Sequence, residues 1–324
     1  MKLAFSAMMA GLIAFGALAG AGQALAQDAA GRPLHIIVGA PPGGTTDNLA
    51  RAVGKGMEGT LKRPVIVENK PGAGGNIAAD FVAKSAPNGE TILMSFTSHT
   101  VNPTLYKKLP FDTLRDFTPI TMVATVPSVL IASKTVPANT VADLIAYAKR
   151  NPGKLNFAIG GIGSSLHLAG EQFKMMTGVD IVNVSYKGTA PALTDVLAGH
   201  VDLMFASMLN VLPHAGSDRI KILGVTSAAP SPQLPNVPPI GATVKGFESN
   251  AWFGLFGPAK LPAETTQRLY EAARKAVDDP AFRKRLQDEG GHPASMTPGQ
   301  FGEFVAQDIQ RWAKVVKFSG AVAE

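Results

Sequence analysis

The sequence predicts an α/β protein with two domains. Its 324 residues are more than one compact core usually holds. Hydrophobic residues make up 46% of the chain and charged residues 17%, a balance typical of globular proteins. From Leu34 onwards, short runs of β-branched residues alternate with amphipathic segments, which is the pattern of βα units around mainly parallel sheets.

The first 26 residues have the features of a secretory signal peptide. Lys2 precedes an apolar run at 3–21, and Ala24, Leu25 and Ala26 form an A-x-A cleavage site. A transmembrane anchor or a buried helix is the alternative, but small residues and no basic cluster follow the run. We therefore expect export to the periplasm, with cleavage after Ala26.

The composition limits the kinds of site, anchor and ligand that the protein can have. The chain has no cysteine, which excludes disulfides, thiolate nucleophiles, Cys-based zinc sites and a lipoprotein anchor, so the mature protein is expected not to be membrane-anchored. Residues 1–26 contain one lysine and no acid, so cleavage lowers the formal net charge from +6 to +5, which suits an anionic ligand. The dense basic cluster at 283–285 lies among acidic residues on an apparent exposed helix, which argues against nucleic acid.

Periodicity predicts the elements in chain order. Strands are expected at 34–38, 65–68, 91–95, 129–133, 155–159, 181–185, 203–206 and 220–225. Helices are expected at 47–57, 76–85, 141–150, 165–177, 190–198 and 262–277, and a long amphipathic helix at about 298–318. The proline-rich stretch 228–241 indicates a surface excursion.

A glycine-rich loop, PPGGTTD at 41–47, stands between the first predicted strand and the first helix. Glycines let a ligand approach the backbone, and the first amides of the helix are unpaired donors that suit a carboxylate or a phosphate. The alternative is a turn in which Thr46 or Asp47 serves only as the helix N-cap.

A second loop of this kind, GGIGSS at 160–165, follows the strand at 155–159. Two helix-start loops from different domains would hold one carboxylate from both sides, with Ser164 and Ser165 adding hydroxyl donors.

Other chemistries fit the sequence less well. PGAGGN at 71–76 is not a dinucleotide fingerprint, because Ile77 stands where glycine or alanine is needed, and we expect no cofactor there but helix–strand packing or a share of the cleft wall. A serine hydrolase using Ser164 or Ser165 with His167 lacks the second glycine of G-x-S-x-G. The six histidines have no metal-ligand spacing, so no metal is expected.

Several ordered motifs resemble one family over nearly the whole mature chain. They are PPGGTTD with Ala50-Arg51, VENKPGAGGNIAADFVAKSAPNGETIL (67–93), NPTLYKKLPFD (102–112), HLAGEQF (167–173), YKGTAPALTDVLAGHVDLMF (186–205) and FGLFGPAKLP (253–262). Together they resemble the Bug/TctC solute-binding proteins of tripartite tricarboxylate transporters. The resemblance implies a type II periplasmic-binding-protein fold, with domain 1 formed by 27–125 plus 248–324, domain 2 by 126–247, and a returning strand at 252–256.

The resemblance also implies a ligand site in the cleft. The implied ligand-binding residues are Ala40, Pro42, Gly43, Gly44, Thr45, Thr46, Asp47, Phe96, Ser98, Gly161, Gly163, Ser164, Ser165, Thr189, Ala190 and Asp202. Ala40 and Thr45 depart from the aromatic residue and the further glycine that many members have, which alters the pocket edge. Asp202 could bind the amino group of an amino acid or could brace its domain.

The expected function is reversible capture of a small carboxylate by a protein that is not an enzyme. The ligand would be a dicarboxylate, tricarboxylate, amino acid or aromatic acid, passed to the membrane permease subunits of a tripartite tricarboxylate transporter. A periplasmic serine hydrolase and a ligand sensor feeding a two-component system are the alternatives.

Overall fold

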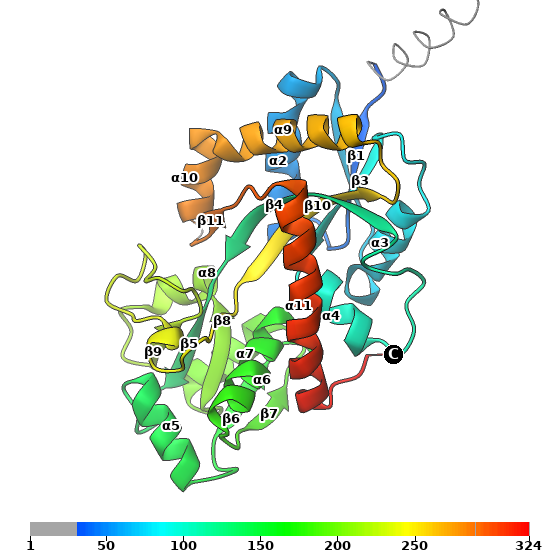
Figure 1. The fold of residues 1–324 in the computed structure, drawn as a ribbon. Coiled ribbons are helices and arrows are strands. Elements are labelled where there is room, and N and C mark those ends of the chain that lie inside the picture. The colour runs from blue at the N-terminus through cyan, green and yellow to red at the C-terminus, as the bar shows by residue number, and fades with distance from the viewer. Residues whose placement is uncertain (1–30, 289, 324) are drawn as a thin grey trace, which may run out of the picture.

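The computed structural model describes residues 31–288 and 290–323, so the expected signal peptide at 1–26 lies outside the described residues. The chain forms two α/β domains, one above the other in Figure 1, each built on one sheet. Within the described ranges, no helix is both long and apolar enough to cross a membrane.

The first sheet has six strands in the order β11-β4-β10-β3-β1-β2. β1 lies parallel to β2 and β3, whereas β10 lies antiparallel to β3 and β4. The strands are β1 (Leu34–Val38), β2 (Val65–Asn69), β3 (Thr91–Phe96), β4 (Phe117–Val126), β10 (Ala251–Pro258) and β11 (His292–Pro293).

Helices cover both faces of this sheet. On one face lie α2 (Thr45–Leu61), α9 (Ala263–Asp278) and α10 (Pro280–Asp288), and on the other lie α3 (Asn76–Ala83) and α11 (Pro298–Ser319). α2 shows why the sequence folds this way, because Leu49, Val53 and Met57 recur at helical spacing and are all buried against the sheet.

The second sheet has five strands in the order β7-β6-β8-β5-β9. They are β5 (Ser128–Ser133), β6 (Asn156–Ile159), β7 (Val182–Ser185), β8 (Leu203–Ser207) and β9 (Ile220–Val225). α5 (Val141–Arg150) and α6 (Ser165–Thr177) pack on one face, and α7 (Thr189–Ala198) and α8 (Met208–Val211) on the other. Each domain is therefore a three-layer sandwich with its own core.

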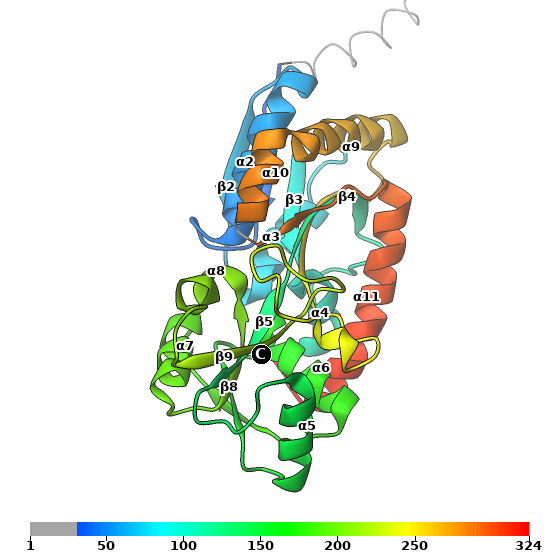
Figure 2. The same cartoon turned by 90° about the vertical axis from the view of Figure 1, so that its left-hand side faces the viewer.

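The chain passes between the sheets twice. It leaves the first sheet at Pro127, between β4 and β5, and returns through 248–250 into β10. α11 runs alongside both domains (Figure 2). Its Trp312 packs in one buried cluster with Val101 and Leu105 of α4 (Ser98–Leu105), in the first domain, and with Leu168 of α6, in the second.

The predicted elements are confirmed, with strand ends that differ by no more than one residue. β4, α4, α8 and β11 were not among the predictions. The returning strand implied at 252–256 is β10. The stretch 228–241 contains no helix or strand before the short 3-10 turn Ile240–Ala242. Two further 3-10 turns lie at Ala73–Gly75 and Leu212–His214.

Candidate functional site

A cleft lies between the two domains at the carboxyl ends of strands from both sheets, where α/β proteins bind ligands. Its main cavity, about 580 Å³, is of the size that holds a small ligand. A narrower cavity of about 170 Å³ adjoins it at the crossovers and shares Thr45, Ser165, Ala251 and Phe253 with it. The main cavity is lined by Ala40, Pro41, Pro42, Gly43, Gly44, Thr45, Thr46, Phe96, Thr97, Ser98, Ser164, Ser165, Ala251 and Phe253.

The described lining of both cavities contains hydroxyl, backbone and apolar groups, and no charged side chain. The narrower cavity adds Ser128, Ser207 and Ser249 to the hydroxyls, and Val126, Pro127, Leu166 and Leu209 to the apolar wall. This lining offers a ligand hydrogen-bonding groups and apolar surface.

The first glycine-rich loop is shaped by Asp47, which is buried in the first turn of α2. Its carboxylate accepts hydrogen bonds from the Gly43 amide at 2.9 Å, from Arg51 Nε at 3.0 Å and from Asn69 Nδ2 at 2.9 Å. Burial by itself raises the pKa of Asp47, but these hydrogen bonds outweigh it and hold the pKa below its ordinary value. The hydrogen bond from the Gly43 amide to Asp47 therefore stabilises the loop, and each group has its partner within the loop.

The amides of this loop that remain free to donate a hydrogen bond are those of Thr45 and Thr46. The first intrahelical bond of α2 runs from the Asn48 amide to the Gly44 carbonyl at 2.9 Å, so the amides of Thr45 and Thr46 precede the helical ladder. The N-cap Gly44 has no side chain to occupy them. They lie at the cavity and carry the positive end of the α2 dipole.

The loop at 160–165 is organised in the same way. The Gly163 amide donates to His167 Nδ1 at 3.1 Å, and Ser164 Oγ donates to the Gly161 carbonyl at 2.8 Å. Ser164 Oγ also accepts from the His167 amide at 3.2 Å and so caps α6. Because those groups are occupied, the cleft-facing donors are the Ser165 hydroxyl and the first amides of α6.

The third glycine-rich segment supports the cleft wall and does not line it. A Cβ added at Gly39, just after β1, would lie 2.7 Å from the Gly75 Cα, and one added at Gly75 would lie 3.3 Å from the Phe96 ring. The absence of side chains lets this segment pack behind Phe96. Asn102 of α4 donates to the Gly74 carbonyl at 3.1 Å and fixes the turn. The predicted structural role of 71–76 agrees with this packing.

Ten of the sixteen candidate ligand residues line the cleft. They are Ala40, Pro42, Gly43, Gly44, Thr45, Thr46, Phe96, Ser98, Ser164 and Ser165. Asp47, Gly161 and Gly163 belong to the two loops without lining the cavities. Thr189 and Ala190 begin α7 next to the second loop, since a Cβ at Gly160 would lie 2.9 Å from the Thr189 amide nitrogen.

Asp202 is not brought together with the other candidates. It precedes β8 and accepts hydrogen bonds from the Asn156 amide at 2.9 Å and from Asn156 Nδ2 at 3.2 Å, at the first residue of β6. The loop at 160–165 leaves the other end of β6, one strand length away. The geometry therefore favours the bracing role of Asp202 over a contact with a ligand amino group.

Sequence reasoning missed the floor of the cleft. Ala251 and Phe253 of β10 line both cavities, and Thr97 lies between the predicted Phe96 and Ser98. Phe253 opens the FGLFGPAKLP motif, which was a signal for a returning strand but not for its exposed face. The serines at 128, 207 and 249 come together only at the crossovers, and nothing local in the sequence marks them.

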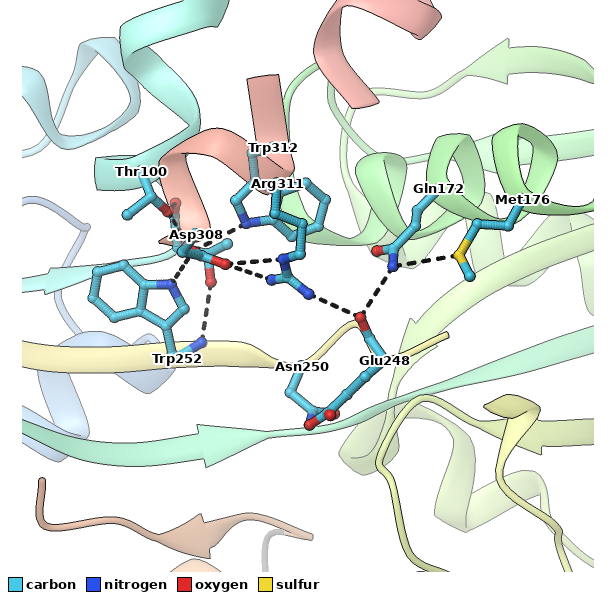
Figure 3. Close-up of polar contacts among 10 residues, drawn as sticks. Thr100, Gln172, Met176, Glu248, Asn250, Trp252, Asp308, Arg311 and Trp312 are labelled. Carbon is cyan, nitrogen blue, oxygen red and sulfur yellow. Dashed lines mark hydrogen bonds and ion pairs between the residues drawn. The ribbon is translucent and has the colours of Figure 1, made fainter. Parts of the chain in front are cut away.

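Asp308 of α11 links the elements next to the crossovers through hydrogen bonds to its carboxylate (Figure 3). Its Oδ2 accepts from Thr100 Oγ1 at 2.6 Å, from Trp252 Nε1 at 2.9 Å and from Trp312 Nε1 at 3.1 Å. Its Oδ1 accepts from Arg311 Nη2 at 2.6 Å. We call these five residues the Asp308 cluster; they join α4, β10 and α11 through one buried carboxylate.

The Asp308 cluster reaches the second domain through Arg311. Arg311 Nη1 donates to the Glu248 carbonyl at 2.9 Å, and the same carbonyl accepts from Gln172 Nε2 of α6 at 3.2 Å (Figure 3). A separate cavity of about 330 Å³ adjoins Arg311, Trp252 and Asp308 and shares no lining residue with the cleft. Because side chains alternate along β10, Trp252 faces this cavity while Phe253 faces the cleft.

The arrangement does not form a serine nucleophile with its base. His167 Nδ1 accepts from the Gly163 amide, and Nε2 faces Glu171 Oε1 at 3.6 Å, so neither nitrogen is directed to the hydroxyl of Ser164 or Ser165. Among the described residues, no group of three or more His, Asp or Glu side chains is placed to hold a metal ion.

Two α/β domains, two crossovers and a ligand-sized cleft between the domains define a solute receptor of the periplasmic-binding-protein class. Residues 49–320 match the family model of the tripartite tricarboxylate transporter family receptor, TctC, and the chain belongs to this family. The family expected from the motifs is thus confirmed. Proteins of this family are solute-binding receptors of the periplasm.

Solved structures of relatives share the whole fold. The structure of R. palustris Rpa4515 with adipate is 34% identical with a TM-score of 0.75, covering 90% of this chain and 98% of that one. The periplasmic binding protein BugD is 34% identical with a TM-score of 0.73, covering 90% and 99%. MatC from Rhodopseudomonas palustris with bound malate is 31% identical with a TM-score of 0.71, covering 88% and 99%.

Proposed function

We propose that this protein captures a small carboxylate in the interdomain cleft and delivers it to the permease subunits of a tripartite tricarboxylate transporter. The observation that carries the proposal is the pair of helix-start loops, one from each domain, that present amides and hydroxyls to a cleft without charged lining residues. Relatives of similar fold hold adipate and malate, which are small carboxylates.

The donors are sufficient for the affinity of a receptor. Each hydrogen bond to a charged group contributes about 1.5–3 kcal/mol, and each helix dipole about 0.3–2 kcal/mol, depending on burial. A few such contacts, less the entropy of association, reach the roughly 8–12 kcal/mol of micromolar to nanomolar binding. No cationic side chain is required.

Capture is proposed to close the cleft by bending at Pro127 and at 248–250, the two crossovers. The ligand favours the closed state because it contacts both loops only there. Export follows the same proposal, with a mature protein that begins at Gln27 in the periplasm. Mass spectrometry of the protein recovered from a periplasmic extract tests that start point.

Isothermal calorimetry of the mature protein, stripped of ligand by unfolding and refolding, tests the capture of a carboxylate. The panel contains adipate, malate, a tricarboxylate, an amino acid, an aromatic acid and a neutral sugar. We expect heat with at least one acid, and the bound acid to be recovered chemically unchanged. Binding of the sugar alone, or turnover of the acid, contradicts the proposal.

A variant pair tests the position of the site. Ser165→Ala removes a hydroxyl shared by both cavities and should weaken the preferred acid about 10- to 150-fold if that hydroxyl contacts the anion. Ser85→Ala, just after α3 and outside the cleft, is the matched control and should leave the affinity unchanged.

A further inference from the structure

We propose that His167 is a positioning residue for the ligand site: its Nδ1 must accept the Gly163 amide so that Ser165 and the first amides of α6 face the anion. The inference rests on the proposed function of the cleft. It assigns direct ligand contact to Ser165 and indirect roles to Gly163, Ser164 and His167, although all four lie in or next to the same loop.

The geometry of the loop carries the first step. Gly163 has φ +76, and a Cβ there would lie 2.3 Å from Leu105 Cδ2 of α4, so the loop is pressed against the first domain at this residue. The Gly163 amide is turned away from the cleft and donates to His167 Nδ1 at 3.1 Å. His167 is buried, so no water can replace this acceptor without repacking.

The surroundings of His167 set which nitrogen carries the proton. Nδ1 must be unprotonated to accept the Gly163 amide, so the neutral ring carries its proton on Nε2. Nε2 faces the carboxylate of Glu171 at 3.6 Å, an electrostatic contact that favours a proton at this position. The tautomer is therefore determined from both sides of the ring.

Glu171 is itself held in place as an anion. Its Oε1 accepts from Lys174 Nζ at 2.6 Å and from Asn183 Nδ2 of β7 at 2.7 Å, and the side chain is buried. Burial alone raises the pKa of Glu171, but the contacts with His167, Lys174 and Asn183 lower it to about 2. The carboxylate that orients His167 is thus ionised throughout the physiological range.

Ser164 completes the division of roles. Its hydroxyl donates to the Gly161 carbonyl and accepts from the His167 amide, which leaves the ligand no proton of this hydroxyl. Ser165 lies next in the chain and lines both cavities, and no hydrogen bond joins its side chain to another described residue. The loop is fixed through Gly163 and Ser164 and presents Ser165.

Calorimetry of two His167 variants, with the acid that the wild type binds, tests the inference. His167→Leu removes the acceptor and should weaken binding about 3- to 10-fold, the effect of one neutral hydrogen bond. His167→Asn places an amide oxygen near the position of Nδ1 and should restore most of the affinity. His99→Leu, at a buried histidine whose ring packs against Phe111, Phe117 and Phe256 of the first domain, is the matched control and should bind like wild type.

A long-range proton–nitrogen correlation spectrum of the isotope-labelled, ligand-free protein reads the tautomer of His167 directly, independently of folding by the leucine variant and of any ligand. We expect a ring protonated on Nε2 alone. A ring protonated on Nδ1, or an asparagine variant as weak as the leucine variant, overturns the inference. A wild type that binds no acid would instead refute the proposed function, and the spectrum would still decide the role of His167 in holding the loop.

Discussion

Replacement of Asp308 by alanine should be among the most destabilising single changes in the chain. Its carboxylate satisfies the hydroxyl of Thr100 and the indole N–H groups of Trp252 and Trp312, and all three side chains are at most 1% exposed. Each donor left unpaired in the core costs about 1–3 kcal/mol. Thr100 can still donate to the Thr97 carbonyl at 2.9 Å, so two indole donors remain without an acceptor.

The two unpaired indole N–H groups together therefore cost about 2–6 kcal/mol of the free energy of unfolding. Arg311 adds little to this figure, because about a third of its side chain is exposed and water can replace Asp308 there. We expect Asp308→Ala to lower the free energy of unfolding by about 4 kcal/mol, similar to the loss of one partner from a buried ion pair. The free energy of unfolding of Asp308→Asn should lie between those of wild type and Asp308→Ala, since asparagine keeps one acceptor oxygen.

Urea unfolding followed by tryptophan fluorescence measures this loss. The chain has two tryptophans, and both donate to Asp308, so the signal reports on the Asp308 cluster itself (Figure 3). Asp218→Ala, at an exposed aspartate of the second domain, is the control and should change stability by less than about 0.5 kcal/mol. If Asp308→Ala unfolds within about 1 kcal/mol of wild type, the two indole bonds do not stabilise the fold as argued.

Three further outcomes follow from glycine geometry and from buried titratable groups. Gly163→Ala should destabilise more than Gly43→Ala, as measured by urea unfolding, because both have positive φ but only a Cβ at Gly163 meets Leu105; equal losses would contradict this. Burial lowers the pKa of His99 to about 3, so wild type should lose stability as pH falls from 6.5 towards 3, and His99→Leu should lose less over that range. The pKa of Glu171 is lowered from 4.5 to about 2, so its ionised form stabilises the fold above pH 4.5. The difference in free energy of unfolding between wild type and Glu171→Gln should therefore narrow as pH falls from 4.5 to 2. A constant difference would mean that the charge plays no part.

The regular part of the fold is predictable because its signals are local. β1, β6 and β8 are short apolar runs, and α2 and α11 show one apolar face each, so periodicity alone locates them. α4 could not be found in this way. Its sequence SHTVNPTL contains an internal proline and little amphipathic pattern. The helix forms because Thr100 donates to Asp308 and Asn102 to Gly74 and Asn76, contacts with residues distant in sequence.

β4 was missed for a related reason. Pro119 interrupts its apolar run, and a strand containing proline needs a place where no ladder donor is required. Pro119 pairs with Phe256 of β10 at a shift in register between Leu255 and Phe256. A bulge of this kind depends on the partner strand, which lies more than a hundred residues away, and single-sequence patterns do not report it.

The candidate site, too, was predictable only where its signals are local in the sequence. Both helix-start loops were predicted, since glycines followed by Ser, Thr or Asp mark the start of a helix. Which amide remains free was not predictable, because it depends on whether Asp47 turns back to Gly43 and whether His167 turns back to Gly163. Asp202 shows the limit of carrying a role over by motif, since its Oδ2 accepts two hydrogen bonds from Asn156 at the end of β6 away from the cleft loop.

Under the proposed function, the side chains of Asp47 and His167 would allow the receptor to hold an anion without a counter-charge. Asp47 and His167 each accept from the amide four residues upstream, which fixes both loops in the absence of a ligand. The remaining amides then need no reorganisation, so their dipoles stabilise an anion at little entropic cost. Because the described lining of the cleft has no charged side chain, release of the proposed carboxylate would break only hydrogen bonds that water can replace. A receptor that must give up its cargo gains from that reversibility, whereas a buried arginine left unpaired after release would oppose it.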